Sequence, residues 1–256
     1  MKERLDILLV NKGLAPSREK AKAMIMEGNV FVDNNREDKA GSTFDVNANI
    51  EVKGNTLKYV SRGGLKLEKA MTHFGITLEG KVCMDIGAST GGFTDCMLQN
   101  GAVKVYAVDV GYGELAWSLR NDPRVINMER TNIRYLTDEQ IPEPIDFISV
   151  DVSFISLTLI LPVVYRFLRE GGSCACLVKP QFELGPHQTD KGVVRDPALR
   201  QQAVDKVLLF CQERLGLECL GVVPAAVKGP KGNQEYIVCL RRVGAGQVAC
   251  GSEVEQ

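Results

Sequence analysis

The sequence has few of the residues that usually hold metal ions. Its 256 residues include only two histidines, and no two of its eight cysteines are separated by two residues. Structural zinc sites are generally built from such cysteine pairs, or from cysteine and histidine together. The cysteines lie mostly in apolar stretches, which is typical of reduced, buried thiols in a cytoplasmic protein. The sequence therefore predicts no metal site.

Long apolar runs are also missing. The longest charge-free apolar stretch of note, Val152 to Tyr165, is shorter than the roughly 20 residues that a bilayer requires. The first residues, MKERLDILLV, carry charges where a signal peptide needs an uninterrupted apolar region. We therefore expect a cytoplasmic protein that has no membrane partner and is not exported.

An excess of charge of one sign is the third absence. The chain has 31 Lys and Arg against 32 Asp and Glu, so the whole molecule has no field that would attract a nucleic acid. Its 45% apolar and 25% charged residues are ordinary for a globular protein. The length leaves room for one large domain and a small one. Any basic surface must therefore be local.

Residues 1–59 have the pattern of a small α+β domain. A short helix, a turn at residues 13–16 and a second helix capped by Ser17 precede Gly28, and the stretch VFVD then indicates a strand. Arg18 and Lys22 are four residues apart, so both project from one helix face. Taken alone, this pattern favours a solvated basic face over an RNA contact.

Residues 60–244 alternate between apolar stretches of strand length and stretches with helical periodicity. The predicted strands span residues 81–88, 103–110, 124–129, 145–152 and 173–180, and the predicted helices span residues 93–100, 113–121, 156–168 and 197–216. This order is typical of a parallel sheet covered on both faces. Residues 217–224 and 235–242 predict an antiparallel pair at the end of the sheet. Residues 245–256 have no periodicity, which predicts a flexible tail.

The first predicted strand runs into a glycine-rich turn, DIGASTGGF, which opens a helix. Such a turn typically cradles a nucleotide-like ligand. A dinucleotide site would favour the spacing GxGxxG. The spacing here is Asp85-x-Gly87-x-x-x-Gly91, and Ala88 occupies a position where none of the dinucleotide glycines falls. Asp85 suits a ligand with a positive amino group, and Asp109 lies at the distance at which a carboxylate grips a ribose. S-adenosylmethionine is favoured over NAD, although glycines can also serve close packing alone.

Four polar residues are placed to meet at the same edge of the sheet. Asp151 and Lys179 end the fourth and fifth strands, and the carboxyl ends of parallel strands carry the chemistry of such folds. Glu235 begins the last strand, and Lys66 lies on the helix that enters the domain. The plain structural alternative is two salt bridges at a sheet edge.

Several longer motifs carry a resemblance to a known family. The sequence resembles the TlyA group of rRNA 2′-O-methyltransferases, historically called haemolysin A, in VSRGGLKL, DIGASTGGFTD, DVGYGELAWSLRNDPRV, ERTN, DVSFISL, LVKPQFE, GVVRDP and GNQEY. The resemblance covers nearly the whole chain. It implies a Rossmann-like, seven-stranded, FtsJ-like α/β sheet that uses S-adenosylmethionine, with a small N-terminal α+β RNA-binding domain like that of a ribosomal small-subunit protein.

The resemblance also implies roles for particular residues. Its Lys-Asp-Lys-Glu catalytic tetrad matches Lys66, Asp151, Lys179 and Glu235. The residues expected to bind the cofactor are Asp85, Gly87, Ser89, Thr90, Gly91, Gly92, Phe93, Asp109 and Asp151. The residues expected to contact RNA are Arg4, Arg18, Lys22 and Arg62. Trp117 is expected to pack in its helix near the adenine.

The expected reaction is methyl transfer to a ribose 2′-hydroxyl. The resemblance implies a cytidine in ribosomal RNA, and large-subunit RNA is the expected target. Lys179 is expected to orient that hydroxyl and receive its proton. The alternatives are an NAD-linked oxidoreductase, a non-catalytic RNA-binding or ribosome-assembly factor, and a cytolysin. The loop spacing argues against the first, and the complete tetrad argues against an inactive enzyme.

Overall fold

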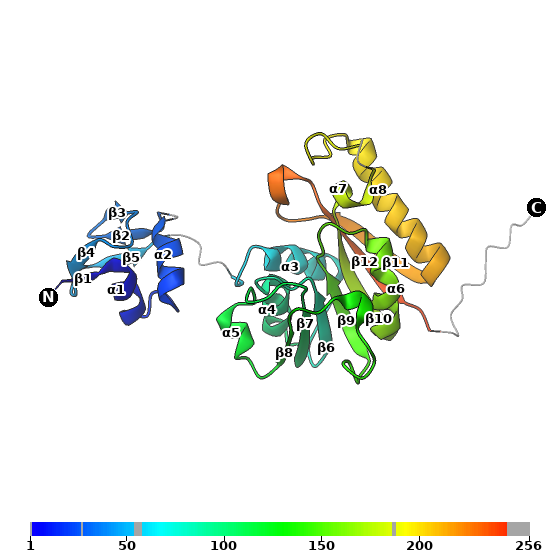
Figure 1. The fold of residues 1–256 in the computed structure, drawn as a ribbon, viewed down its shortest axis with the longest axis horizontal. Helices are drawn as coiled ribbons and strands as arrows, with labels where there is room; N and C mark the ends of the chain where they lie inside the picture. The colour runs from blue at the N-terminus through cyan, green and yellow to red at the C-terminus, as the bar shows by residue number, and fades with distance from the viewer. Residues whose placement is uncertain (1, 27, 54–57, 186–187, 245–256) are drawn as a thin grey trace, which may run out of the picture. The chain divides into compact units, whose positions relative to one another are not determined.

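The structure is a computed structural model of the whole chain, and it describes residues 2–26, 28–53, 58–185 and 188–244. The chain divides into two compact units, Met1–Thr56 and Leu57–Gln256 (Figure 1). The division falls three residues before the predicted boundary, and Tyr59 packs in the core of the second unit. The predicted flexible tail, residues 245–256, lies outside the described residues.

The described residues of the first unit form two helices and five short strands. They are β1 (Lys2–Arg4), α1 (Leu5–Asn11), α2 (Arg18–Met26), β2 (Val30–Val32), β3 (Asn35–Glu37), β4 (Thr43–Asp45) and β5 (Ile50–Val52). The strands pair antiparallel, β1 with β4 and the other three in the order β3-β2-β5. The hydroxyl of Ser17 accepts a hydrogen bond from the Lys20 amide, as the predicted helix cap requires. The α+β prediction for this unit is confirmed.

The second unit is built on one seven-stranded sheet. Its strands are β6 (Val82–Ile86), β7 (Lys104–Val108), β8 (Val125–Met128), β9 (Ile145–Val150), β10 (Leu168–Val178), β11 (Leu217–Pro224) and β12 (Tyr236–Arg242). They lie in the order β11-β12-β10-β9-β6-β7-β8. β12 is antiparallel to both of its neighbours, whereas β6 to β10 pair in parallel. The predicted parallel sheet with an antiparallel pair at its end is confirmed.

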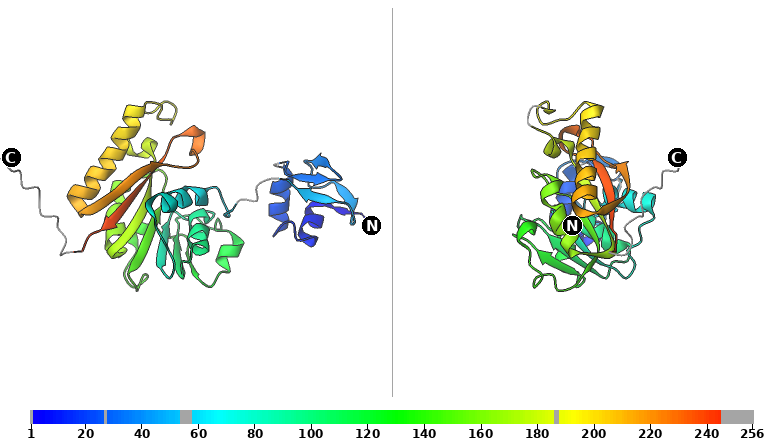
Figure 2. Two further views of the ribbon diagram at one scale, coloured as in Figure 1. Left: turned by 180° about the vertical axis from the view of Figure 1, so that it is seen from behind. Right: turned by 90° about the vertical axis from the view of Figure 1, so that its right-hand side faces the viewer.

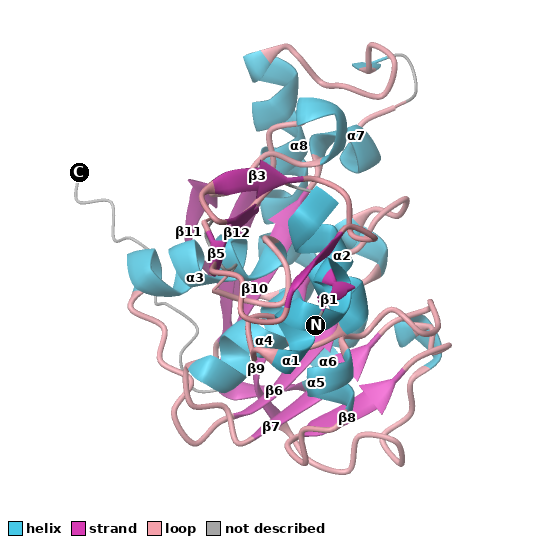
Figure 3. Ribbon diagram, turned by 90° about the vertical axis from the view of Figure 1, so that its left-hand side faces the viewer, coloured by secondary structure: helices cyan, strands magenta, loops and turns pink. Residues whose placement is uncertain are grey.

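Helices cover both faces of this sheet (Figures 1 and 3). α3 (Gly63–Phe74) and α4 (Gly92–Gln99) share one apolar cluster with alternate strand residues such as Phe147. α6 (Leu161–Phe167) and α8 (Pro197–Phe210) share the other cluster with the intervening residues, such as Ile148. Because neighbouring side chains of a strand point to opposite faces, the strands of this sheet are apolar on both sides.

Three predicted helices are shorter or divided. Residues 113–121 form only α5 (Trp117–Arg120), and the Trp117 side chain is 78% exposed rather than packed. Residues 156–168 form a 3₁₀ turn, Leu157–Leu159, before α6, because Ser156 caps the turn and Pro162 favours the first turn of a new helix. α8 continues as a π-helical turn, Cys211–Leu215, which ends at Gly216.

The cysteines are free thiols in the described part of the chain, and all of those except Cys219 are buried. Burial raises the pKa of the Cys83 and Cys239 thiols to about 12, so both stay protonated at neutral pH. Within the described ranges, no group of three or more His, Cys, Asp or Glu is arranged to hold a metal ion. The helices of those ranges include none that is long and apolar enough to cross a membrane.

Candidate active site

The carboxyl ends of β6, β9 and β10 open onto one cavity of 240 Å³. The loop after β6 forms one wall, Asp151 and Ser153 follow β9, and Lys179 follows β10. The residues that line the cavity are Ser61, Gly63, Gly87, Ala88, Ser89, Thr90, Gly92, Phe93, Asp151, Ser153 and Lys179. The cavity therefore joins the predicted glycine loop to two of the predicted catalytic residues.

The glycines of this loop are required by contacts within the protein. Gly87 has a φ of +83° and Gly91 a φ of +93°, which favour glycine. A Cβ atom at Gly87 would overlap the Asp151 carbonyl, and one at Gly91 would overlap the Leu119 side chain. The packing alternative therefore accounts for the missing side chains. The loop still presents its backbone and the start of α4 to the cavity.

Asp85 differs from its predicted role. Its carboxylate is fully buried and does not line the cavity. It accepts hydrogen bonds from the Thr94 amide at 2.9 Å, the Thr94 hydroxyl at 2.7 Å and the Ser149 hydroxyl at 2.8 Å. Burial raises its pKa to about 6 despite these bonds. Asp85 therefore fastens β6 to α4 and β9 beneath the glycine loop.

Asp109 follows β7 and lies against the glycine loop. Its two carboxylate oxygens accept hydrogen bonds from the amides of Ser89 and Gly111, each at 2.7 Å. The Ser89 hydroxyl donates in turn to Glu114 at 3.0 Å. Sequence reasoning missed Glu114, although it lies in the motif that follows this strand. These contacts hold the loops after β6 and β7 together at the point where a ribose was expected.

Glu129 was missed as well. It follows β8, and its carboxylate accepts hydrogen bonds from the amides of Gly113 and Glu114 and from the Arg120 guanidinium. Its place in the ERTN motif was the available signal. Glu129 fixes the loop that carries Glu114.

Lys179 lies on the cavity wall with two partners. Its ammonium nitrogen is 2.6 Å from the Asp151 carboxylate and donates a hydrogen bond to the Ser153 hydroxyl at 2.9 Å. All three residues line the cavity, and the Lys179 side chain is only 9% exposed. Sequence reasoning missed Ser153, which lies two residues after Asp151 in the DVSF stretch.

Lys66 and Glu235 form a second, closed pair. The Lys66 ammonium lies 2.6 Å from Glu235 Oε2, and the Glu235 side chain is fully buried. Glu235 Oε1 has no hydrogen-bond partner among the described residues, and Gly229 leaves room for it because a Cβ atom there would overlap the carboxylate. Neither Lys66 nor Glu235 lines the cavity. In the described part of the chain, no hydrogen bond or ion pair joins this pair to Lys179 and Asp151.

Glu183 ties together the segments that follow β9 and β10. It is buried on α7 (Pro180–Glu183), directly after Lys179, and accepts hydrogen bonds from the Leu157 amide at 2.8 Å and the Ser156 hydroxyl at 2.6 Å. On the same two segments the rings of Phe154 and Phe182 lie 5.0 Å apart. Glu183 therefore holds the Ser153 segment beside the Lys179 segment.

The residues expected to contact RNA lie in both units. The Arg4 and Arg18 guanidinium groups pair with the buried carboxylate of Asp6, at 3.0 and 2.9 Å. The hydrogen bond from Arg4 is the main cause that lowers the pKa of Asp6 to about 2. Both arginine side chains remain about half exposed, and Lys22 is exposed. Arg62 is exposed just before α3 of the second unit.

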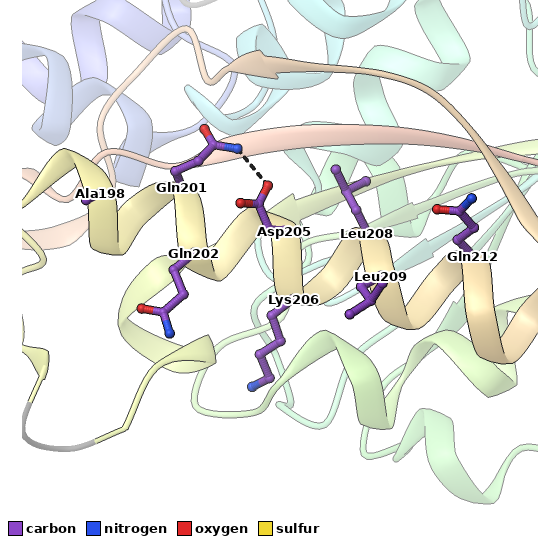
Figure 4. Close-up of a pocket in the computed structure, with 8 residues that line it drawn as sticks. All are labelled: Ala198, Gln201, Gln202, Asp205, Lys206, Leu208, Leu209 and Gln212. Atoms are coloured by element: carbon purple, nitrogen blue, oxygen red, sulfur yellow. Dashed lines mark hydrogen bonds between the residues drawn. The ribbon is translucent and has the colours of Figure 1, made fainter.

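A larger but open hollow of 660 Å³ lies along the outer side of α8 (Figure 4). Gln201 and Asp205 hydrogen-bond each other there at 2.8 Å, beside Leu208 and Leu209. None of the predicted site residues lines this hollow. The smaller cavity at the strand ends is therefore the candidate active site.

The sheet order, the glycine loop after β6 and the polar groups at the strand ends together define a Rossmann-like methyltransferase. The model of the FtsJ-like methyltransferase family matches residues 59–242, and that of the S4 domain matches residues 3–50. The chain belongs to the FtsJ-like methyltransferase family. The resemblance and the fold class predicted from the sequence are both confirmed.

Individual proteins are similar to the chain over most of its length. A candidate rRNA methyltransferase of Bacillus subtilis, YqxC, is 51% identical over 96% of this chain and 88% of that protein. The 16S/23S rRNA (cytidine-2′-O)-methyltransferase TlyA of Mycobacterium tuberculosis is 46% identical over 93% of this chain and 89% of its own length. A solved structure of a candidate hemolysin from Streptococcus thermophilus superposes with a TM-score of 0.74 at 44% identity, covering 94% of this chain and 89% of that one.

Proposed function

We propose that this protein transfers a methyl group from S-adenosylmethionine to the ribose 2′-hydroxyl of a cytidine in ribosomal RNA. The relatives named as rRNA methyltransferases support the substrate class. The observation that carries the proposal is the Lys179 ammonium group, held by Asp151 and Ser153 on the wall of the glycine-loop cavity. Large-subunit RNA is the proposed target, and the cytoplasm, where ribosomes work, is the proposed location.

The residues around the cavity fit the methyl donor. Gly87, Gly92 and Phe93 line it without adding a charge, and a sulfonium ligand has no phosphate that would need a cation. Ser89 and Thr90 supply hydroxyl groups, and Asp109 beside them is the proposed partner of the ribose. S-adenosylmethionine supplies an activated methyl group when it is bound. Asp85 contributes through the loop that it fastens.

Lys179 is the proposed group that orients the 2′-hydroxyl and, in its neutral amine form, takes the proton that the hydroxyl loses when its oxygen bonds to the methyl group. Asp151 and Ser153 fix the position of the Lys179 nitrogen, so the hydroxyl meets an amine that is already in place. Lys66 and Glu235 complete the tetrad as a neutralised pair behind this group. Most of the rate enhancement is expected from proximity and alignment, because the donor is already activated.

The test replaces Lys179 with Ala and with Arg. We expect Lys179→Ala to reduce methylation by at least about a hundredfold, the lower end for a general acid or base. S-adenosylmethionine binding, measured by calorimetry, should remain close to that of the wild type. Arg keeps the charge but cannot accept a proton, so Lys179→Arg should be equally inactive. Methylation mapped by ribose position, on ribosomal RNA from cells that lack this protein, provides the readout, and wild-type activity of Lys179→Ala would refute the assignment.

The alternatives have less support. The family match and the 51% and 46% identical relatives favour a methyltransferase over a non-catalytic assembly factor. The cytolysin alternative has only the hemolysin name of some relatives in its favour. A purified protein that binds ribosomal subunits and leaves them unmethylated would restore the assembly-factor alternative.

A further inference from the structure

Two loops of the second unit, residues 188–196 and 225–234, are joined to each other, and the second packs against Glu235. One loop precedes α8 and the other joins β11 to β12, and both views of Figure 2 place them at the same end of the sheet. The buried side chain of Asn233 joins them, because it accepts a hydrogen bond from the Val194 amide at 3.1 Å and donates one to the Gly192 carbonyl at 2.9 Å. Gly229, in the second loop, lies against Glu235. The two loops therefore form one rim beside the active site.

Each loop carries a lysine at a strained position. Asp190 and Val193 exchange backbone hydrogen bonds of 2.9 Å across a two-residue turn, in which Lys191 has a φ of +49°. Lys231 has a φ of +56° and is likewise followed by a glycine. Asn or Gly occupies such turn positions with less strain than lysine. Strained positions of this kind often occur at ligand contacts.

The lysines of this rim are not neutralised. Lys191, Lys228 and Lys231 are exposed, and none of them forms an ion pair with a carboxylate in the described ranges. The Lys231 ammonium instead donates a hydrogen bond to the Lys191 carbonyl at 3.3 Å, which holds one lysine at the backbone of another. We define these three residues as the lysine rim. Its like charges repel one another until an anion binds.

The cations at the amino ends of the parallel strands differ from the lysine rim, because they are paired with carboxylates. Lys104 lies 2.6 Å from Glu143, Arg169 lies 2.6 Å from Asp146, and the Arg241 guanidinium lies 3.2 Å from Glu218. All three cations lie where the parallel strands begin, far along the strands from the cavity. These three cations are therefore neutralised by carboxylates, as Arg195 of the rim loop is by Asp190, whereas no ion pair in the described ranges neutralises Lys191, Lys228 or Lys231.

We propose that the lysine rim binds backbone phosphates of the RNA strand on one side of the target nucleotide. This inference rests on the proposed function, because it takes the RNA to be the polyanion that reaches the cavity. Lysine suits such contacts because its ammonium group is a point charge on a flexible stem, and phosphate contacts position a strand without reading its sequence. The rim thus contributes affinity for the strand beside the target ribose, and the S4 domain contributes further affinity from the other unit.

The test is the triple variant Lys191→Asn, Lys228→Gln and Lys231→Asn. Asn at the two turn positions relieves backbone strain, so the melting temperature should stay the same or rise. The KM for ribosomal subunits purified from cells that lack this protein should rise about tenfold, with kcat and S-adenosylmethionine binding nearly unchanged. The slope of log affinity against log salt should fall by about two to three, roughly one for each lost phosphate contact.

The control is the triple variant Lys104→Gln, Arg169→Gln and Arg241→Gln, which removes the same number of charges at the opposite edge. It should retain the wild-type KM and salt slope. If both triple variants shift the KM equally, or if the rim variant binds subunits as the wild type does, the lysine rim is not an RNA contact. A wild-type protein that does not methylate subunits would overturn the proposed function itself, and so separates the two failures.

Discussion

The two lysine–carboxylate pairs at the carboxyl ends of the parallel strands have the same nitrogen–oxygen distance but differ in their exposure to solvent. The Lys66 ammonium nitrogen lies 2.6 Å from the Glu235 carboxylate. Neither residue lines the cavity, and the Glu235 side chain is fully buried. Lys179 and Asp151 also meet at 2.6 Å, but both line the cavity and the Asp151 side chain is 22% exposed. The first pair is therefore suited to hold the fold, and the second is suited to meet a substrate.

The largest expected effect comes from breaking the closed pair. Lys66→Met leaves the Glu235 carboxylate buried without a cation, which should lower the free energy of unfolding by about 3–5 kcal/mol. Lys179→Met should cost clearly less, because water can reach Asp151 through the cavity. Urea unfolding followed by circular dichroism measures both. Lys66→Met combined with Glu235→Gln should recover part of the loss, and equal losses for the two single variants would contradict the distinction.

Asp85 sharpens the comparison because it is a buried carboxylate without a cation. Its pKa is raised to about 6 from an ordinary value of 3.8, so its contribution to stability is fully present below pH 4 and is lost as the pH rises through 6. A pKa difference of this size corresponds to about 3 kcal/mol of unfolding free energy.

Asp85→Asn does not titrate, so its stability relative to the wild type should rise by up to about 3 kcal/mol between pH 4 and pH 7. Urea unfolding of both proteins at intervals across that range provides the measurement. The hydrogen bonds from Thr94 and Ser149 favour the ionised carboxylate of Asp85, so they oppose the effect of burial and limit this rise. A difference that is constant with pH would exclude this titration.

Substitution of Glu183 tests what positions the Lys179–Asp151 pair at the cavity. Glu183→Gln places an amide where the carboxylate accepts the Leu157 and Ser156 hydrogen bonds, which should cost about 1–3 kcal/mol of unfolding free energy. The Ser153 segment should then loosen, so kcat should fall while S-adenosylmethionine binding changes little. Glu183→Asp keeps the charge and should retain more activity than Gln. A variant as active as the wild type would show that the Ser153 segment holds its place without Glu183.

Ser153 should give the smallest change in stability. Ser153→Ala removes one hydrogen bond from Lys179 at the cavity wall, which should cost at most about 1 kcal/mol. Because Lys179 then loses one of the two groups that fix its nitrogen, kcat should fall by about tenfold or less with the KM for RNA unchanged. Steady-state methylation assays measure both constants. A fall in RNA affinity instead would indicate that Ser153 contacts the substrate.

The sequence predicted what depends on the regular geometry of strands. Apolar stretches of strand length place Asp151 and Lys179 at neighbouring strand ends, and their meeting follows from the parallel pairing of β9 and β10. The sequence predicted the division of residues 156–168 only in part. Proline is favoured in the first turn of a helix, so Pro162 is consistent with a helix that begins near it, but it does not indicate the separate 3₁₀ turn before α6.

Side-chain pairings across distant segments were harder to predict. Asp85 was expected at the ligand because it ends a strand beside a glycine loop, and only packing shows that Thr94 and Ser149 enclose it. Arg4 and Arg18 were expected at RNA, and their pairing with Asp6 depends on how the start of the chain meets α2. No spacing in the sequence indicates such a contact.

The antiparallel β12 has a consequence for the order in which the protein matures. Lys66 precedes every strand of the large sheet, whereas its partner Glu235 is separated from it by 169 residues and introduces the strand that is synthesised last. A nascent chain therefore presents Lys66 without its counterion until Glu235 has been synthesised. A chain that ends before Glu235 would therefore leave the Lys66 ammonium without its counterion.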